Sequence, residues 1–212
     1  GMIAPMVAVD NKDVKFIVLM AGPGTPIDEL LVEQSTRYSQ LQGADAATIA
    51  TNTKIQKDTY AFIKNYESSD FEKDLATFLK TEMSNLPENV KPQTEEELNE
   101  SVNNQVDAVH NKWFLYFIKY NPGINLSKLK CSVLAINGSL DFQVPAKTNL
   151  KAIETALQKG KNKNYKIVEL PGLNHLFQAA TTGTLDEYSV IEQTISPKVL
   201  SLMSDWILNQ TK

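Results

Sequence analysis

Two residues of this chain have the types and the spacing that acid–base chemistry requires. Asp141 lies in the segment NGSLDFQVP, His175 lies in PGLNHLFQ, and each segment directly follows an apolar run. A carboxylate that accepts a hydrogen bond from one imidazole nitrogen fixes the tautomer of the ring and leaves the other nitrogen as a general base. Taken singly, Asp141 is explained as a turn cap before Pro145, and His175 as a hydrogen-bonded core histidine. Taken together on neighbouring loops, the two residues predict a catalytic pair.

The other side chains that could transfer a proton or attack a carbonyl have simpler interpretations. His110 has apolar neighbours at helical spacing and is interpreted as structural. Ser139 shares the loop of Asp141 and is interpreted as a turn residue, and Ser35 and Ser101 fall in helical segments. Cys131 opens an apolar strand and is interpreted as a small core residue. The sequence therefore predicts no nucleophile within residues 1–212.

The two loops need a scaffold that brings them to one edge of the fold. Strands are predicted over residues 14–20, 131–138 and 165–172, because these apolar runs end in turns rich in Gly, Pro or Asn. Helical spacing predicts helices over residues 3–10 and 146–160. Strands that alternate with helices form a parallel sheet, and ligands of such sheets lie beyond the carboxyl ends of the strands. We therefore expect three loops at that edge, AGPGTP, NGSLDFQVP and PGLNHLFQ.

Residues 27–120 have a different character from their flanks. Their pattern is polar and helical throughout, as in ATIATNTKIQKDTYAFIKNY, and predicts an all-helical insertion in the chain. The expected organisation is a core segment of residues 1–26, a helical insertion of residues 27–126, and a second core segment of residues 127–212.

Composition excludes several function classes. A net charge of -4 and a pI near 5.3 argue against nucleic acid as a partner, since phosphate binding draws on an excess of Lys and Arg. No apolar run approaches the length of about 20 residues that a transmembrane helix needs. The single cysteine excludes an intramolecular disulfide and a cysteine-rich metal site. No cofactor is implied, residues 1–11 do not read as a signal peptide, and the compartment stays open.

At this point several segments together resemble a known family. LKCSVLAINGSLDFQVP, ELPGLNHLFQAATTGTLDEY and TISPKVLSLMSDWI are similar to the closing third of an α/β-hydrolase, nearest to bacterial serine esterases and acyl hydrolases related to the prolyl-oligopeptidase-like peptidases. MIAPMVAVDNKDVKFIVLMAGPG joins the resemblance, which leaves out only the helical insertion. It implies a partial α/β-hydrolase fold, in which the last three strands form a short parallel sheet flanked by helices, with a large helical cap insertion. It also implies that Asp141 is the triad acid and His175 the triad base, acting on a small-molecule ester or acyl substrate.

The family nucleophile lies in a Gly-x-Ser-x-Gly elbow that precedes the acid and the histidine. No such sequence occurs in residues 1–212. The family elbow is followed by a helix resembling MIAPMVA, so the resemblance places the serine a few residues before Gly1. It implies the carboxyl-terminal part of a serine hydrolase, inactive by itself. Two alternatives remain: a serine peptidase as the parent enzyme, or a non-catalytic half-domain that acts as a binding or self-association module.

The same resemblance bears on assembly. In the family, the strand at residues 14–20 would pair on one side with the strand that precedes the nucleophile. A strand whose neighbour is missing is a template for another chain, and exposed apolar surface favours association. We therefore expect a homodimer through this sheet edge, covering the region around residues 2–20. The alternative is that the N-terminal helix folds over the open edge and leaves a monomer of marginal stability.

Overall fold

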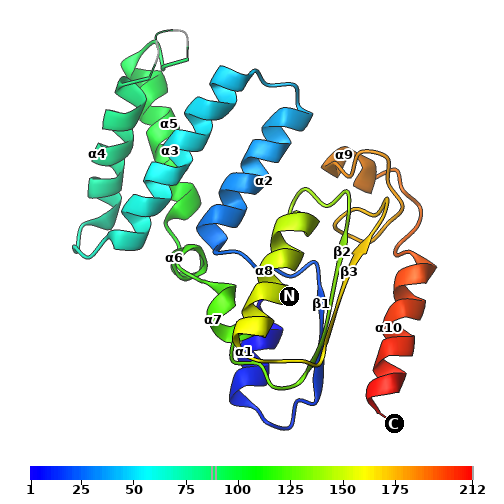
Figure 1. Ribbon diagram of the computed structural model, residues 1–212. Coiled ribbons are helices and arrows are strands. Elements are labelled where there is room, and N and C mark those ends of the chain that lie inside the picture. The colour runs from blue at the N-terminus through cyan, green and yellow to red at the C-terminus, as the bar shows by residue number, and fades with distance from the viewer. Residues whose placement is uncertain (87, 89, 212) are drawn as a thin grey trace. The chain divides into compact units, whose positions relative to one another are not determined.

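The computed structural model describes residues 1–86, 88 and 90–211. Over these residues the chain is mixed α/β, with ten helices and one three-stranded sheet (Figure 1). In chain order the elements are α1 (Ile3–Asp10), β1 (Phe16–Met20), α2 (Ile27–Leu41), α3 (Ala46–Asn65), α4 (Phe71–Ser84), α5 (Glu95–Val109), α6 (Lys112–Ile118), α7 (Pro122–Leu126), β2 (Ser132–Gly138), α8 (Ala146–Lys159), β3 (Tyr165–Leu170), α9 (Leu185–Tyr188) and α10 (Pro197–Gln210). None of the described helices is long and apolar enough to cross a membrane.

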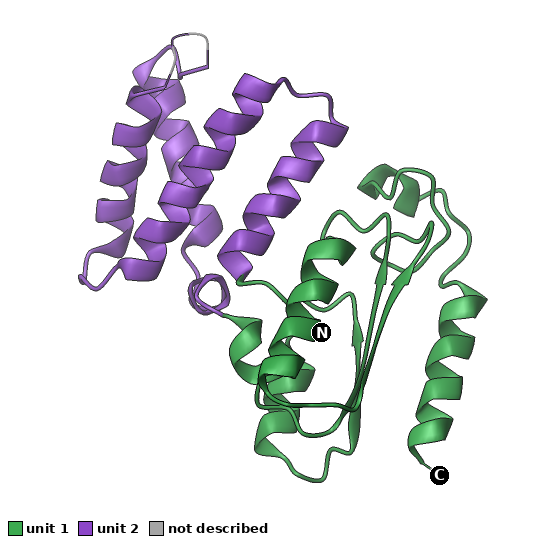
Figure 2. Ribbon diagram, in the orientation of Figure 1, with its two compact units in different colours: residues 1–26, 121–212 green, residues 27–120 purple. Residues whose placement is uncertain are grey.

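The chain divides into two compact units (Figure 2). The sheet unit comprises residues 1–26 and 121–212, and the helical unit comprises residues 27–120. The two ends of the helical unit meet, since the backbone N–H of Ile27 donates to the carbonyl of Tyr120 at 3.1 Å. The sheet unit begins again at Asn121, six residues before the expected boundary, because α7 packs against α1 and α8 and buries Leu126 in the sheet unit's core.

The sheet is parallel, with strand order β1-β2-β3, as the alternation of strands and helices predicts. Phe16 lies opposite Ser132, and Val133 lies opposite Tyr165, so the register places the carboxyl ends of the three strands at one edge. β2 is central and buried along almost its whole length, which explains the unbroken apolar run of its sequence.

Alternate residues of the strands face two separate apolar cores. On one face Leu19 and Ala135 pack against the apolar side of α8, including Ile153 and Leu157, with α1 and α7 completing this layer. On the other face Ile136 packs toward α10, and the rings of Phe16 and Trp206 meet in a T-shaped arrangement with 5.7 Å between their centroids. The sheet unit is thus a three-layer arrangement with helices on both faces, visible in Figure 1.

The helical unit has its own apolar centre. α2 packs on α3, α4 packs on α5, and α3 also contacts α4 and α6. The residues of this unit with the lowest exposure are Ile27, Leu30, Ile63, Leu75, Leu79, Val102 and Ile118. In α6, at the end of this unit, Ile118 is buried in the centre, whereas Trp113 is 61% exposed and Tyr116 57% exposed. Trp113 instead stacks on Phe117, with 4.6 Å between ring centroids.

Candidate functional site

Three loops converge at the carboxyl edge of the sheet: residues 21–26 after β1, 139–145 after β2, and 171–178 after β3. Backbone hydrogen bonds tie the second loop to the third, since Ser139 donates to Leu170 and Leu140 donates to Leu173, both at 2.9 Å. The first loop is tied to the end of β2 through Ala21, which donates to Ile136 at 2.9 Å. This edge is the place where a parallel sheet commonly binds its ligands.

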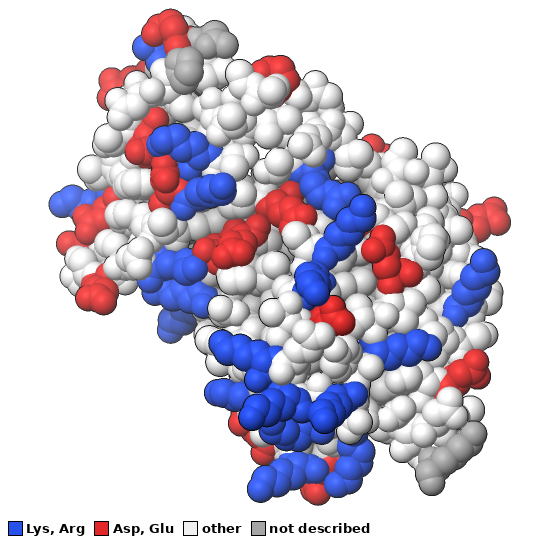
Figure 3. Space-filling model, viewed as in Figure 1, with Lys and Arg blue, Asp and Glu red and all other residues white. Residues whose placement is uncertain are grey.

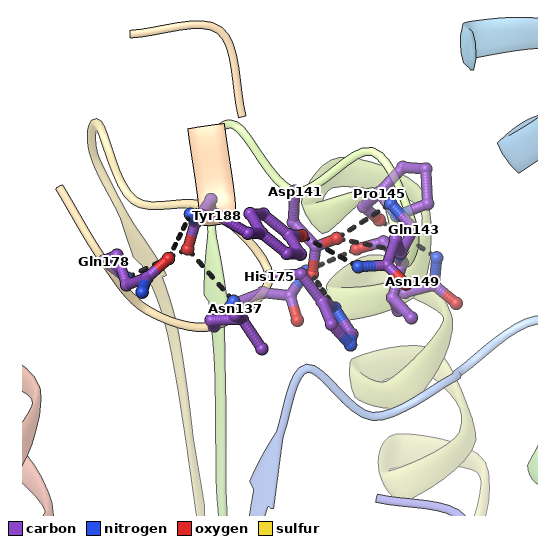
Figure 4. A network of polar contacts seen from close by, with 11 residues as sticks. Asn137, Asp141, Gln143, Pro145, Asn149, His175, Gln178 and Tyr188 are labelled. Carbon is purple, nitrogen blue, oxygen red and sulfur yellow. Dashed lines mark hydrogen bonds and ion pairs between the residues drawn. The ribbon is translucent and has the colours of Figure 1, made fainter. Parts of the chain in front are cut away.

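Asp141 and His175, from two of these loops, are in direct contact (Figure 4). Oδ2 of Asp141 lies 2.8 Å from Nδ1 of His175, within the range expected for a carboxylate that orients a histidine. The Asp141 side chain is fully buried, whereas the His175 side chain is 27% exposed. Nε2 of His175 has no hydrogen-bond partner in the described part of the chain. The pair thus combines a buried, oriented acid with a ring nitrogen available to another group.

Three further donors hold the Asp141 carboxylate. The backbone N–H groups of Gln143 and Val144 both donate to Oδ1 at 2.9 Å, so Asp141 caps the turn that follows it. The side-chain amide of Asn137 donates to Oδ2 at 3.3 Å. The turn-cap interpretation and the acid interpretation of Asp141 are therefore compatible, because one oxygen caps the turn while the other contacts His175.

Asn137, the penultimate residue of β2, is a site residue that sequence reasoning missed. Its side chain is 1% exposed, and its Nδ2 bridges the carbonyl of Val144 and the carboxylate of Asp141. Its Oδ1 is buried and has no partner among the described residues. The sequence does carry a signal for this role, because Asn137 is the one amide in the mostly apolar strand SVLAING. A polar side chain buried in such a strand needs hydrogen-bond partners.

Asn149, in the first turns of α8, fixes the loop after β1. Its fully buried Oδ1 accepts from the N–H of Gly24 at 2.9 Å and from Thr25, and its Nδ2 donates to the Pro145 carbonyl at 3.0 Å. A Cβ on Gly24 would lie 2.3 Å from the Asn149 carbonyl oxygen, so only glycine allows this approach. Ala21 opens the same loop with φ of 46°, a conformation that is strained for a residue with a side chain.

A third buried asparagine shapes the histidine loop. Oδ1 of Asn174 accepts from the N–H groups of Leu176 and Gln178 at 3.0 and 2.9 Å, and its Nδ2 donates to the Gln178 side chain. Phe177 between them has φ of 60° and is buried. The loop is therefore a locked turn that points His175 toward Asp141, and its strain lies next to the candidate pair.

The segment after the histidine loop is held by a carboxylate. Glu187 of α9 accepts from the backbone N–H groups of Thr181, Thr182 and Gly183 at 2.8 to 3.2 Å. Nearby, the side-chain amide of Gln143 donates to the Tyr188 hydroxyl at 2.8 Å and so joins α9 to the acid loop. Burial raises the pKa of Tyr188, and the charge of Asp141 acts in the same direction.

The hydrogen bonds to Glu187 make a pH-dependent contribution to stability. The N–H donors, led by that of Gly183, lower the pKa of the Glu187 carboxyl. A lowered folded-state pKa stabilises the fold above the unfolded pKa of about 4.3 and loses this effect as pH falls through the folded value. We expect wild type to melt above Glu187→Gln at pH 7, with the gap shrinking between about pH 5 and pH 3. Calorimetric measurement of the melting temperatures between pH 7 and pH 3 checks this prediction, with Glu192→Gln at an exposed glutamate as the control. A difference in melting temperature between wild type and Glu187→Gln that does not change with pH would contradict the prediction.

The other sequence candidates do not join the pair. Cys131 precedes β2 at the opposite end of the sheet, and burial raises the pKa of its thiol, which disfavours the thiolate. Ser139 Oγ accepts from the N–H of Gly172, consistent with a turn residue.

The remaining candidates belong to the helical unit, where Ser35 lies in α2 and Ser101 in α5. His110, also in that unit, is not a core residue, since its side chain is 52% exposed and its Nδ1 lies 2.6 Å from Glu72.

Among the described residues no group of three or more His, Cys, Asp or Glu side chains could hold a metal ion. Comparison with protein-family models, curated proteins and solved structures gives no significant match to this chain.

Proposed function

We propose that Asp141 and His175 are the acid and the base of a serine hydrolase of the α/β-hydrolase class, acting on carboxylic esters or related acyl bonds. The observation that carries the proposal is the 2.8 Å contact between the buried Asp141 carboxylate and Nδ1 of His175. In the proposed reaction, Nε2 of His175 takes the proton of a serine hydroxyl as the serine attacks the acyl carbon. His175 then returns the proton to the leaving group, and a water molecule activated by the same nitrogen hydrolyses the acyl-enzyme.

The order of the elements supports assignment to this class. The acid follows one parallel strand, the histidine follows the next, and both loops lie at the carboxyl edge. This is the chain order of acid and histidine in α/β-hydrolases, whose serine comes first. The helical unit enters the chain between β1 and β2, and under this proposal it is the cap insertion.

We place the serine in a Gly-x-Ser-x-Gly segment that precedes Gly1. Gly1 packs so closely on Gly22 that a Cβ on Gly1 would lie 2.3 Å from the Gly22 Cα. Because Gly22 belongs to the loop after β1, a segment entering α1 through Gly1 comes from the same edge as His175. Backbone N–H groups of that segment would also supply the oxyanion site that an acyl transfer requires.

Two observations test this proposal. The coding DNA upstream of Met2 is expected to encode Gly-x-Ser-x-Gly in frame. The protein that includes this segment is expected to react with a fluorophosphonate probe at that serine, and to lose the reaction in His175→Ala. An upstream stop codon, or labelling that is independent of His175, would rule the assignment out.

A self-association module is the second candidate, and the outer edge of β1 favours it. In the described chain β1 pairs only with β2, and the pairing of Lys15 and Ala21 with β2 directs the N–H and C=O groups of Phe16, Val18 and Met20 outward. β1 carries no charged side chain, whereas β3, the other outer strand, carries Lys166 and Glu169. Charged side chains protect an edge from pairing, so β1 is the edge more open to another strand.

For residues 1–212 we therefore expect a dimer that pairs β1 with β1 of a second copy. α1, which contacts β1, also exposes the apolar side chains of Ile3 and Val7, and exposed apolar surface favours association. Val18→Pro removes an outward N–H without breaking a bond to β2 and should give a monomer. Glu169→Pro makes the matched change on β3 and should leave the dimer intact. Light scattering over a concentration series decides: a wild-type monomer mass at every concentration refutes the dimer.

A further inference from the structure

The end of the sheet opposite the candidate site carries a concentration of lysine. The three segments that lead into the strands, residues 10–15, 127–131 and 159–164, contain seven lysines and two aspartates. We name this surface the lysine rim. Its lysines are all exposed, and Figure 3 shows basic side chains gathered over this end of the sheet unit.

The three segments form one continuous surface despite their separation in the sequence. Ser132 donates to the carbonyl of Lys15 at 3.1 Å, and Nζ of Lys130 donates to the carbonyl of Gly160 at 2.9 Å. Buried Asn162 binds the second segment to the third through the carbonyls of Leu129 and Cys131. The lysines are therefore held on a rigid base at the amino ends of the strands.

The rim lysines lack acidic partners. In the described part of the chain, no carboxylate lies within ion-pair distance of any of the seven. The chain's net charge hides this local excess, since the helical unit has 16 acidic and 9 basic residues, while the sheet unit has 12 basic and 9 acidic ones. Unpaired like charges on one rigid surface repel one another, so an anionic partner would relieve this repulsion.

A groove of about 570 Å³ between α7 and α8 continues the rim. Lys128 and Lys159 line it together with Lys151, and Ile124, which is 55% exposed, lies one helical turn before Lys128. An exposed apolar side chain among lysines suits the boundary of a bilayer, where charges meet lipid phosphates and an apolar group enters between headgroups.

The composition of the rim distinguishes a bilayer from nucleic acid. The rim contains no arginine and no aromatic residue, so it lacks both the planar guanidinium fork and the rings on which bases stack. Lysine is a flexible point charge without a fixed fork of donors, which suits a diffuse layer of phosphates. We propose that the lysine rim is a docking surface for anionic phospholipid bilayers, an interaction that is independent of the hydrolase proposal.

The test is sedimentation of residues 1–212 with vesicles of phosphatidylcholine alone or with 30% phosphatidylglycerol. We expect binding only to the anionic vesicles, weakening steeply between about 50 and 300 mM salt. The variant Lys128→Glu/Lys161→Glu/Lys163→Glu should bind at least about 100-fold more weakly, because each lysine at an anionic surface contributes roughly a factor of five. Lys130 is left in place since it bonds to Gly160.

The control carries the same charge change elsewhere. Lys73→Glu/Lys80→Glu/Lys112→Glu alters exposed lysines of the helical unit that have no ion pair among the described residues, and it should bind like wild type. Equal loss in the two triple variants would mean that net charge, not the rim, governs binding and would overturn the proposal. Tighter binding to duplex DNA than to the anionic vesicles, or no vesicle binding at about 50 mM salt, would overturn it as well. Circular dichroism verifies that both variants are folded.

Discussion

Asp141→Ala is expected to lower the free energy of unfolding of the sheet unit by about 3–5 kcal/mol. The carboxylate is fully buried and accepts from two backbone N–H groups, the Asn137 amide and His175. Alanine leaves these donors without an acceptor, and water cannot replace it without opening the loop. Because domains are stable by only about 5–15 kcal/mol, this change would remove a large part of the total.

Urea denaturation followed by the fluorescence of Trp206 measures this effect in the sheet unit. Replacing Trp113, the tryptophan of the helical unit, by phenylalanine in every protein removes the second signal. Asp141→Asn keeps an acceptor for the turn but removes the negative charge that faces His175. Its decrease in the free energy of unfolding should therefore lie between those of Asp141→Ala and the control. The control is Asp205→Ala, an exposed aspartate of α10, which should change stability by less than about 0.5 kcal/mol. Asp141→Ala as stable as this control would mean that the four contacts are not formed in solution.

The second large effect concerns catalysis. In the protein that includes the proposed serine segment, His175→Ala is expected to lower kcat for short p-nitrophenyl esters by about 10⁴-fold or more. The reason is that a serine hydroxyl without its general base is a weak nucleophile, and here one histidine would serve both chemical steps. Asp141→Asn should also lower kcat severely, since it disturbs the tautomer of His175 that the 2.8 Å contact fixes.

Two comparisons make this measurement decisive. His110→Ala, in the helical unit, should leave kcat within about twofold, because that side chain is half exposed and its Nδ1 pairs with Glu72 rather than with the candidate site. Residues 1–212 by themselves should hydrolyse the ester no faster than their His175→Ala variant. Turnover well above background in residues 1–212 that disappears in His175→Ala would show that a nucleophile lies within this chain.

The parts of the fold that follow from local pattern could be predicted. Apolar runs ended by turns identify the three strands, and parallel strands bring their carboxyl ends to one edge, so Asp141 and His175 were expected to be close. The short helix α7 was not expected, because PGINL resembles a loop until Asn121 is seen to cap it and Leu126 to be buried. A five-residue helix has too few positions for its apolar spacing to be recognised.

The asparagines and the lysine rim could not be predicted for a different reason. Asn137, Asn149 and Asn174 each serve backbone groups of a loop, and their roles depend on which carbonyl and N–H groups the fold leaves without partners. The rim lysines are spread over about 150 residues, and only the shared edge of the sheet brings them together. Both features are set by tertiary structure rather than by local sequence.

The hydrogen bond that joins Ile27 to Tyr120 has a consequence for how the chain folds. β1 must find β2 across an intervening segment of roughly 110 residues, and closing a flexible loop of that length costs about 4 kcal/mol of chain entropy. A helical unit that folds first and brings its own two ends together replaces this long loop by a short one. The helices make local contacts that form quickly, so the helical unit would fold first and hold β1 near β2 before the slower parallel pairing begins.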